Sequence, residues 1–246
     1  MGYTKSAIVI GASSGIGRET AKALAARGYR LGLVARREHL LAELKNQLDD
    51  SAIAKAFDIT DVPDSAERLM ELISTMGGTD IIVIAAGTAL ENPSLKWDNT
   101  KKTIDVNVIG FAAMVQAAYD YFSSRGTGHI VGITSISAIR GEDYFSPYSA
   151  TKAFQSNLLE ALRVKARKRR QNIRVTEIRP GFVDTEMPGR RDKRFWAVTA
   201  AQAGAGVASA ISKRKRLAYV PARWVLFGWI LKGLPAFLYE ALRSRY

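Results

Sequence analysis

The chain has 246 residues and is 47% hydrophobic, which is enough for a sizeable core in one large α/β domain or two small ones. It contains no cysteine and only two histidines. Disulfides and cysteine metal sites are therefore excluded. With only two histidines, the composition also argues against a histidine-rich metal site and a serine–histidine hydrolase. The formal net charge of +13 fits three kinds of anionic partner: nucleic acid, a membrane surface or a charged ligand. We predict no metal site.

Short, continuously apolar runs alternate with longer amphipathic stretches, as is typical of strands buried on both faces of a parallel sheet. The predicted strands are Ala7–Ile10, Arg30–Ala35, Ile53–Phe57, Ile81–Ala85, His129–Thr134, Arg174–Ile178 and Leu217–Val220. The predicted helices are Gly15–Arg27, Glu38–Asp49, Asp64–Met76, Thr103–Ser123 and Ser149–Arg169. This order, without a long linker or an internal repeat, predicts the α/β class. We expect a single Rossmann-type, doubly wound domain over residues 1–246 with a seven-stranded parallel sheet.

A glycine-rich segment follows the first predicted strand and opens the first predicted helix. Glycine permits the tight turn, lets the backbone approach a pyrophosphate, and lets the helix pack closely on the sheet. The free N–H groups at the helix start attract phosphates. Because a strand precedes the segment and a helix follows it, we predict dinucleotide binding rather than a simple connection. The expected contacts are Gly11, Ser13, Ser14, Gly15, Ile16 and Gly17.

The end of the second predicted strand indicates which dinucleotide is bound. Enzymes that use NAD place an acidic residue there for the ribose hydroxyls, whereas arginine accommodates a 2′-phosphate. Here Ala35 is followed by Arg36 and Arg37, so we predict NADP(H). Asp58 closes the third strand and is placed either to contact the adenine edge or to act as a turn residue beside Thr60.

Tyr148 and Lys152 are four residues apart, so they share one face of a predicted helix. A neighbouring ammonium lowers the pKa of a phenol, which then exchanges a proton with a carbonyl or alcohol near neutral pH. Such a pair by itself is an ordinary helix surface feature. Combined with the glycine-rich segment, it predicts an NADP(H)-dependent oxidoreductase that acts on ketones or secondary alcohols.

With these motifs in place, the chain resembles the short-chain dehydrogenase/reductase family over roughly residues 6–220. Two further positions match the family's active-site motifs: Asn107, and Ser135 thirteen residues before Tyr148. The resemblance implies that Tyr148 donates or accepts the proton, and that Lys152 lowers the pKa of Tyr148 and holds the nicotinamide ribose. It further implies that Ser135 hydrogen-bonds the substrate oxygen, and that Asn107 positions a water linking Lys152 to solvent.

The resemblance extends to the segment Pro180–Thr185, where Val183 and Thr185 are expected to hold the nicotinamide carboxamide. It also implies a homodimer or homotetramer, built from the two long helices predicted at 103–123 and 149–169. The sequence departs from the family's pattern at two places. Ile10 stands where a threonine is usual, and Ile84-Ala85-Ala86-Gly87 stands where two asparagines precede an alanine and a glycine. We expect apolar contacts to replace polar ones there, with Gly87 still beside the cofactor.

Residues 221–246 form a predicted C-terminal helical appendage. Its first apolar run, Trp224 to Leu231, has eight residues, whereas a membrane-spanning helix needs about 20. We therefore predict two short helices joined at Gly233–Pro235. Aromatic and aliphatic residues flanked by Arg and Lys are typical of a helix in a membrane interface. Packing on the sheet edge, over the active site or on a second subunit remains an open alternative.

Residues 185–200 are a predicted substrate lid that mixes positive charges with Phe195 and Trp196. Such a lid suits a carbonyl substrate with an anionic head and an apolar body, such as a lipid-like or lipid-linked ketone. The lack of cysteine suits a reducing compartment, so we predict a cytoplasmic protein, either free or associated with a membrane. We expect no nucleic-acid partner, because no zinc-finger or RNA-binding motif is found. The alternative function is a cofactor-binding regulatory or scaffold protein.

Overall fold

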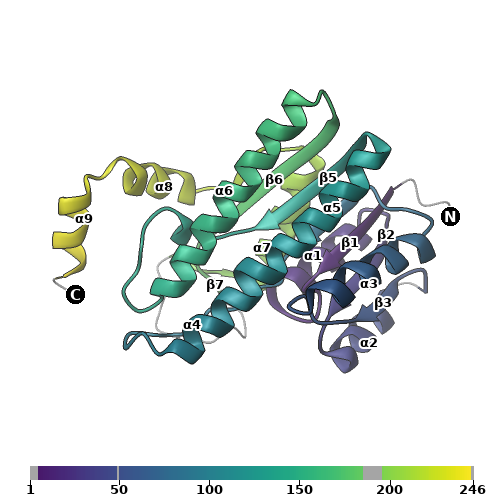
Figure 1. Cartoon of the computed structure of the whole chain (residues 1–246), viewed down its shortest axis with the longest axis horizontal. Helices are drawn as coiled ribbons and strands as arrows, with labels where there is room; N and C mark the ends of the chain where they lie inside the picture. The colour runs from purple at the N-terminus through teal and green to yellow at the C-terminus, as the bar shows by residue number, and fades with distance from the viewer. Residues whose placement is uncertain (1–4, 49, 185–195, 245–246) are drawn as a thin grey trace.

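A computed structural model describes residues 5–48, 50–184 and 196–244 and contains a parallel sheet with helices on both faces (Figure 1). Its strands lie in the order β3-β2-β1-β4-β5-β6-β9, and every neighbouring pair is parallel. The bounds are β1 (Lys5–Ile10), β2 (Tyr29–Ala35), β3 (Ile53–Ala56), β4 (Ile81–Ile84), β5 (Thr127–Ile133), β6 (Asn172–Pro180) and β9 (Leu217–Val220). The predicted Rossmann-type fold with a seven-stranded parallel sheet is confirmed.

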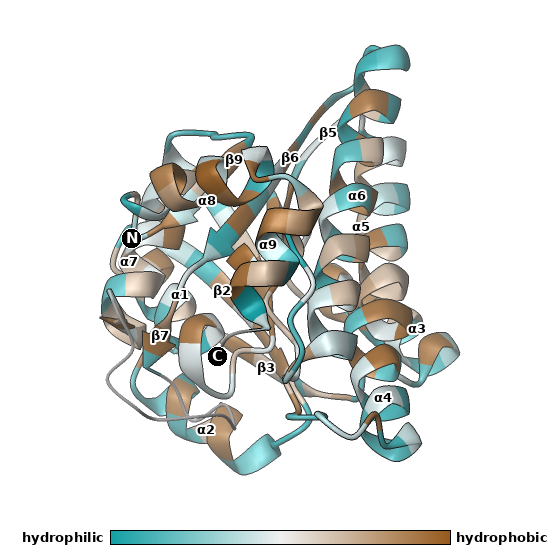
Figure 2. Cartoon of the chain, turned by 90° about the vertical axis from the view of Figure 1, so that its left-hand side faces the viewer, coloured by the Kyte–Doolittle hydropathy of each residue, from teal (hydrophilic) through white to brown (hydrophobic). Residues whose placement is uncertain are grey.

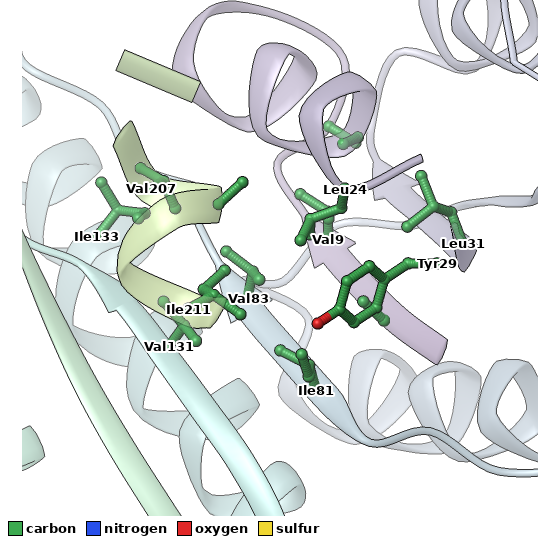
Figure 3. Packing of buried hydrophobic residues seen from close by; sticks show 14 of the residues in the cluster. Val9, Leu24, Tyr29, Leu31, Ile81, Val83, Val131, Ile133, Val207 and Ile211 are labelled. Atoms are coloured by element: carbon green, nitrogen blue, oxygen red, sulfur yellow. The ribbon is translucent and has the colours of Figure 1, made fainter. Parts of the chain in front are cut away.

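Two hydrophobic clusters, one on each face of the sheet, form the core. Alternate residues of β1 point to opposite faces, so Val9 joins one cluster and Ile10 the other. The helices on the face of Val9 are α1 (Gly15–Ala25), α2 (Glu38–Asn46) and α7 (Ala200–Ser212). The helices on the other face are α3 (Val62–Thr75), α5 (Phe111–Arg125) and α6 (Ser146–Lys168). Figure 3 shows side chains of α1 and α7 packed over the strands within the first cluster.

Helix α7 is a helix that the sequence analysis missed. Its composition is dominated by alanine and glycine, so its amphipathic pattern is weak. Thr199 and Gln202 form a capping box, with Thr199 Oγ1 accepting from Gln202 N at 3.2 Å, and this Thr-x-x-Gln spacing was the available signal. The small residues have a packing role, because a Cβ at Gly204 would lie 2.4 Å from the carbonyl carbon of Glu19 in α1.

The helix predicted over 103–123 belongs to a helical stretch that begins earlier, at Trp97, and has three consecutive pieces, so the prediction missed most of the first piece. These are α4 (Trp97–Ile104), a π-helical turn (Asp105–Gly110) and α5. The wider turn lies where the helix passes close to the β3–α3 connection, since a Cβ at Gly110 would lie 2.6 Å from Ile59 Cγ1. Such turns are frequent at functional sites, and this one carries Asn107. The helix predicted to Asp49 ends at Asn46, and Asp49 itself lies outside the described residues.

The appendage folds as the two short helices that were predicted, α8 (Trp224–Gly233) and α9 (Ala236–Arg243). They extend away from the sheet in Figure 1, and Figure 2 shows their largely apolar composition. Among the described residues no single helix has the length and apolar character to cross a membrane. The pair α8 and α9 together meets those measures but is bent by 113°. A minor two-stranded ladder of β7 (Val183–Asp184) and β8 (Val198–Thr199) precedes α7.

Candidate functional site

A cavity of about 870 Å³ lies at the carboxyl ends of the strands. The strand order reverses between β1 and β4, and ligands of open α/β sheets bind at such a switch point. The predicted site residues that line the cavity are Gly11, Ser13, Ser14, Gly15, Ile16, Gly17, Arg36, Arg37, Asp58, Gly87, Ser135, Tyr148, Lys152 and Val183. Thr185 and most of the predicted lid (185–195) lie outside the described residues.

The turn after β1 requires its glycines. Gly11 has φ +93°, and a Cβ there would lie 2.5 Å from Ala86 N on the neighbouring β4 connection. A Cβ at Gly17 would lie 2.1 Å from the carbonyl oxygen of Gly11. The start of α1 is therefore held close to the turn, with its free N–H groups beside the cavity.

A cluster of hydrogen-bond donors surrounds this helix start. Arg37 Nη2 donates to Ser13 Oγ at 3.1 Å and to Ser14 Oγ at 2.6 Å. Ser14 occupies the N-cap position of α1, yet its side chain does not cap the helix. Two hydroxyls, two arginines and uncapped backbone N–H groups therefore meet at one end of the cavity. This donor set fits the phosphates of a dinucleotide.

Arg36 lies at the rim of the same region, with its side chain 66% exposed. Its Nη1 is 3.3 Å from Asp58 Oδ2, and Asp58 Oδ1 accepts from Thr60 N and Thr60 Oγ1, both at 2.9 Å. Burial acts to raise the pKa of Asp58, but the Thr60 hydrogen bonds and the Arg36 charge outweigh it and lower that pKa. Asp58 thus makes the turn contacts that the sequence allowed, and since it also lines the cavity, its contact with the adenine edge stays a prediction. It also orients Arg36, an arginine exposed enough to meet a 2′-phosphate.

The two departures from the family pattern are accommodated by backbone hydrogen bonds and apolar packing. Ile10 is fully buried, and its carbonyl accepts from Ala85 N at 2.8 Å. Gly11 N donates to Val34 O at 2.7 Å, so the turn is tied to β2 as well. This arrangement agrees with our expectation that apolar contacts replace polar ones at these two places.

Three of the four predicted catalytic residues, Ser135, Tyr148 and Lys152, line the other end of the cavity. Tyr148 and Lys152 occupy the first turns of α6, which begins at Ser146 with a proline in its first turn. The Ser135 side chain, just beyond β5, hydrogen-bonds the Tyr148 phenol and accepts from Ser137 N at 3.1 Å. Lys152 is 5% exposed, and its Nζ lies 5.6 Å from the centre of the Tyr148 ring.

The expected lowering of the Tyr148 pKa is not what the structure gives. Burial raises the pKa of the phenol to about 12, against the opposing hydrogen bond from Ser135, and the charge of Glu142 raises it further. Burial also lowers the pKa of Lys152 to about 7. The prediction counted the attraction between ammonium and phenolate but not the loss of hydration, which acts against both charged forms.

Asn107 lies behind Lys152, and its side chain is fully engaged. Its Oδ1 accepts from Thr88 N at 2.9 Å, and its Nδ2 donates to Thr88 O at 2.8 Å and Thr151 Oγ1 at 3.0 Å. Its main-chain carbonyl accepts from Gln155 Nε2 at 2.8 Å. Asn107 therefore joins the β4 connection to α6, and the water that it is expected to position stays a prediction.

Gln155, Glu142 and Arg243 are among the residues at the site that were not predicted. Gln155 contacts Lys152 and follows it by three positions, so helical spacing was an available signal. Glu142 and Arg243 line the cavity from the β5–α6 connection and from α9. No local pattern pointed to either, because their approach to the cavity depends on how distant segments pack.

The comparisons with known proteins agree with this arrangement. The family model for short chain dehydrogenase matches residues 5–195. An uncharacterized oxidoreductase of Myxococcus xanthus is 37% identical over 188 residues, 74% of each protein. One of Mycobacterium tuberculosis is 34% identical over 244 residues, 94% of this chain and 95% of the relative.

Among solved structures, a short-chain dehydrogenase from Sphingobium yanoikuyae in complex with NADPH has a TM-score of 0.80. It is 26% identical, and the match covers 93% of this chain and 94% of that one. The shared fold, the matched motifs and the relatives over nearly the full length lead to one conclusion. This chain belongs to the short-chain dehydrogenase family and is an oxidoreductase of that family.

Proposed function

We propose that the chain is an NADP(H)-dependent oxidoreductase that interconverts ketones and secondary alcohols. The observation that carries the proposal is the pairing of two clusters in one cavity. One is the phosphate-type donor set of Arg36, Arg37 and the serines. The other is the Ser135–Tyr148–Lys152 group. The NADPH in the Sphingobium yanoikuyae relative supports the choice of cofactor.

The bound nicotinamide would supply or accept the hydride. For this chain's own residues, we propose that Arg37, Ser14 and the start of α1 bind the phosphates and that Arg36 binds the 2′-phosphate. Val183 and Thr185 would hold the carboxamide end. Fixing the nicotinamide in this way supplies orientation for the reaction.

The second cluster, Ser135, Tyr148 and Lys152, carries out proton transfer. The Tyr148 hydroxyl gives its proton to the substrate oxygen during reduction and recovers it during oxidation, while the Ser135 hydroxyl donates a hydrogen bond to that oxygen. A raised pKa keeps the phenol protonated at neutral pH, so it is ready to donate. Lys152 stabilises the phenolate that reduction leaves behind.

We further propose a lipid-like or lipid-linked substrate and contact of the appendage with an anionic membrane surface. Exposed apolar side chains on α8 and α9 are flanked by Arg223 and Lys232, which complement anionic head groups. The appendage formed by α8 and α9 also adjoins the cavity. Tyr239 OH donates to Gly141 O at 2.5 Å, and Arg243 pairs with Asp143 at 2.9 Å. A substrate leaving a bilayer would thus reach the cavity over a short path.

We also propose a homodimer or homotetramer formed through α5 and α6. A second, shallower cavity of about 460 Å³ lies along these helices, and nine of its ten lining residues are apolar. The lining residues are Val62, Val108, Ile109, Ala112, Ala113, Val115, Gln116, Phe154, Leu158 and Leu162. A second copy of the chain, presenting the same two helices, would bury this surface.

The deciding experiment is a fluorescence titration of the purified protein with NADPH and with NADH. We expect tighter binding of NADPH, and about tenfold weaker NADPH binding in Arg36→Ala, because a charge-assisted contact with the 2′-phosphate is lost. NADH affinity should change little. Arg27→Ala is the matched control, since Arg27 lies just beyond the far end of α1 and donates to Ala23 O. A preference for NADH, or equal weakening of both cofactors, would contradict the proposal.

A panel of ketones then tests the chemistry. Tyr148→Phe should retain NADPH binding and lose turnover, because the fold is kept and the proton donor is removed. NADPH binding by the parent protein without turnover of any ketone would favour the regulatory or scaffold alternative.

A further inference from the structure

One buried side chain links two predicted catalytic residues directly. Gln155 is fully buried on α6, one turn beyond Lys152. Its Nε2 donates to the carbonyl oxygen of Asn107 at 2.8 Å, and its Oε1 accepts from Lys152 Nζ at 2.9 Å. The amide therefore spans the gap between the π-helical turn and the lysine.

The family resemblance implies a water that Asn107 positions and that links Lys152 to solvent, and this gap is the direct route between the two residues. A water there would donate to the Asn107 carbonyl and accept from the lysine ammonium. The Gln155 amide makes both of those bonds itself. Because its two partners are already at hydrogen-bonding distance from the amide, the direct line between them holds no water.

The assignment of the three N–H donors of Lys152 also supports direct contact with Gln155. An ammonium has three N–H donors. One serves Gln155 Oε1 and another serves Ile133 O at 3.1 Å. One donor remains for the cavity side, where Tyr148 lies. The Asn107 side chain offers no further route, since both of its amide hydrogens are already donated.

We propose that Gln155 is a positioning residue that replaces the bridging water, fixing Lys152 Nζ toward Tyr148 and closing the inner path between Lys152 and solvent. A water conducts protons because it both donates and accepts. A carboxamide holds its N–H protons too firmly, and its oxygen is too weakly basic, to do so at neutral pH. In this protein the Tyr148 phenolate therefore regains its proton from water at the cavity mouth. Glu142 is the charged group that acts on Tyr148 from that side.

The role in proton transfer rests on the proposed function, but the contact with Lys152 does not. The test uses the cofactor-free protein and three variants. Gln155→Leu keeps the volume and removes both hydrogen bonds. Gln155→Ala removes the amide but leaves room for a water. Leu159→Ala is the control, since Leu159 is buried one turn further along α6 and reports simple weakening of the helix.

The first readout is the pKa of Lys152, measured by NMR of ¹³C-labelled lysine and assigned with Lys152→Met. Gln155→Leu should lower the measured pKa of Lys152 by about 1, because the ammonium loses an acceptor in a buried site. Gln155→Ala should stay closer to the parent, with an ordered water between Asn107 O and Lys152 Nζ in its crystal structure. Leu159→Ala should lose thermal stability without changing this pKa.

The second readout is turnover on the best ketone, with KM and kcat separated. We expect kcat to fall about tenfold in Gln155→Leu, which corresponds to about 1.4 kcal/mol in the barrier, with KM little changed. Gln155→Ala should retain most of kcat, because water restores the bridge. A Lys152 pKa unchanged in Gln155→Leu, or an alanine variant as impaired as the leucine variant, would show that Gln155 only fills space. Should the parent bind NADPH and reduce no ketone, the proposed function fails while the NMR titration still decides the role of Gln155.

Discussion

At the scale of single residues, the site depends on placing a lysine where water is nearly absent. Within the described part of the chain, the hydrogen bonds of the Lys152 ammonium go to two neutral acceptors, Ile133 O and Gln155 Oε1. Burial therefore lowers its pKa to about 7, from an ordinary lysine value of 10.5. Groups required for chemistry often reduce the stability of the fold in this way, because they hold a conformation or charge that the fold alone would not favour.

This burial predicts how stability depends on pH. Below pH 7 the lysine is protonated in both the folded and unfolded states, and the cost of burying its charge is fully present. Between about pH 7 and 10.5 the unfolded state binds more protons, so stability rises with pH. Lys152→Met should therefore raise the melting temperature of the cofactor-free protein near pH 6.5, by about 2–4 °C per kcal/mol gained.

Calorimetry across pH 6–9.5 checks this expectation. The advantage of Lys152→Met over the parent should shrink steadily as the pH rises. A variant that is less stable than the parent at pH 6.5, or a difference that does not vary with pH, would contradict it. Lys165→Met serves as a control, since Lys165 lies on the exposed side of the same helix.

At the scale of elements, α6 has two faces with different tasks. Its inner face carries Lys152, which lines the cavity, and the buried Gln155. Its outer face presents Phe154 and Leu158 to the apolar groove shared with α5. A helix can do both because side chains one residue apart point about 100° from each other. Assembly through the outer face would thus restrain α6, the helix that carries active-site residues on its inner face.

Mutation can test whether the outer face of α6 forms the proposed subunit interface. Phe154→Asp places a carboxylate in the groove, and burying that charge against a second copy is costly. We expect the dimer or tetramer to dissociate at least a hundredfold more readily, as measured by light scattering over a range of concentrations. Val164→Asp is the matched control, because Val164 is 63% exposed on α6 and does not line the groove. Unchanged association in Phe154→Asp would remove this face as the interface.

At the scale of the whole molecule, charge and apolar surface are separated. The basic runs at 165–170 and 213–216 precede β6 and β9, so they lie at the amino ends of these strands, opposite the cavity. The cofactor site therefore accounts for only part of the charge of +13. Among the residues that the structure describes, the largest run of exposed apolar side chains is on α8 and α9, beside the cavity. Its members are Leu226, Phe227, Trp229, Ile230, Phe237, Leu238 and Leu242.

Vesicle flotation tests the proposed membrane contact of the C-terminal appendage. We expect the protein to float with vesicles that contain phosphatidylglycerol and to bind neutral phosphatidylcholine vesicles less well, with added salt weakening the binding. Replacing Trp229 and Ile230 together by serine should reduce flotation about tenfold, because two large exposed apolar side chains are removed. Trp97→Ser is the matched control, as Trp97 is 67% exposed on α4. Flotation that the double variant leaves intact, or no flotation of the parent, would overturn the membrane proposal.

The sequence alone determined the sheet, most of its helices and the family, because these depend on local patterns. Buried parallel strands read as continuous apolar runs, and the glycine turn and the Tyr148–Lys152 spacing are short-range signals. The weak pattern of α7 and the π-helical turn before α5 escaped prediction, since both depend on close packing against other elements rather than on local periodicity.

The electrostatics and contacts of the site depend on tertiary packing, which local sequence patterns do not record. The pKa directions of Tyr148 and Lys152 follow from burial, which no spacing of residues reveals. The bridge by Gln155 needs the π-helical turn and α6 to approach within hydrogen-bonding distance, and Arg243 reaches the cavity from the far end of the chain. Sequence patterns record which groups are present and how they repeat. Desolvation and long-range contact exist only once distant segments have packed together.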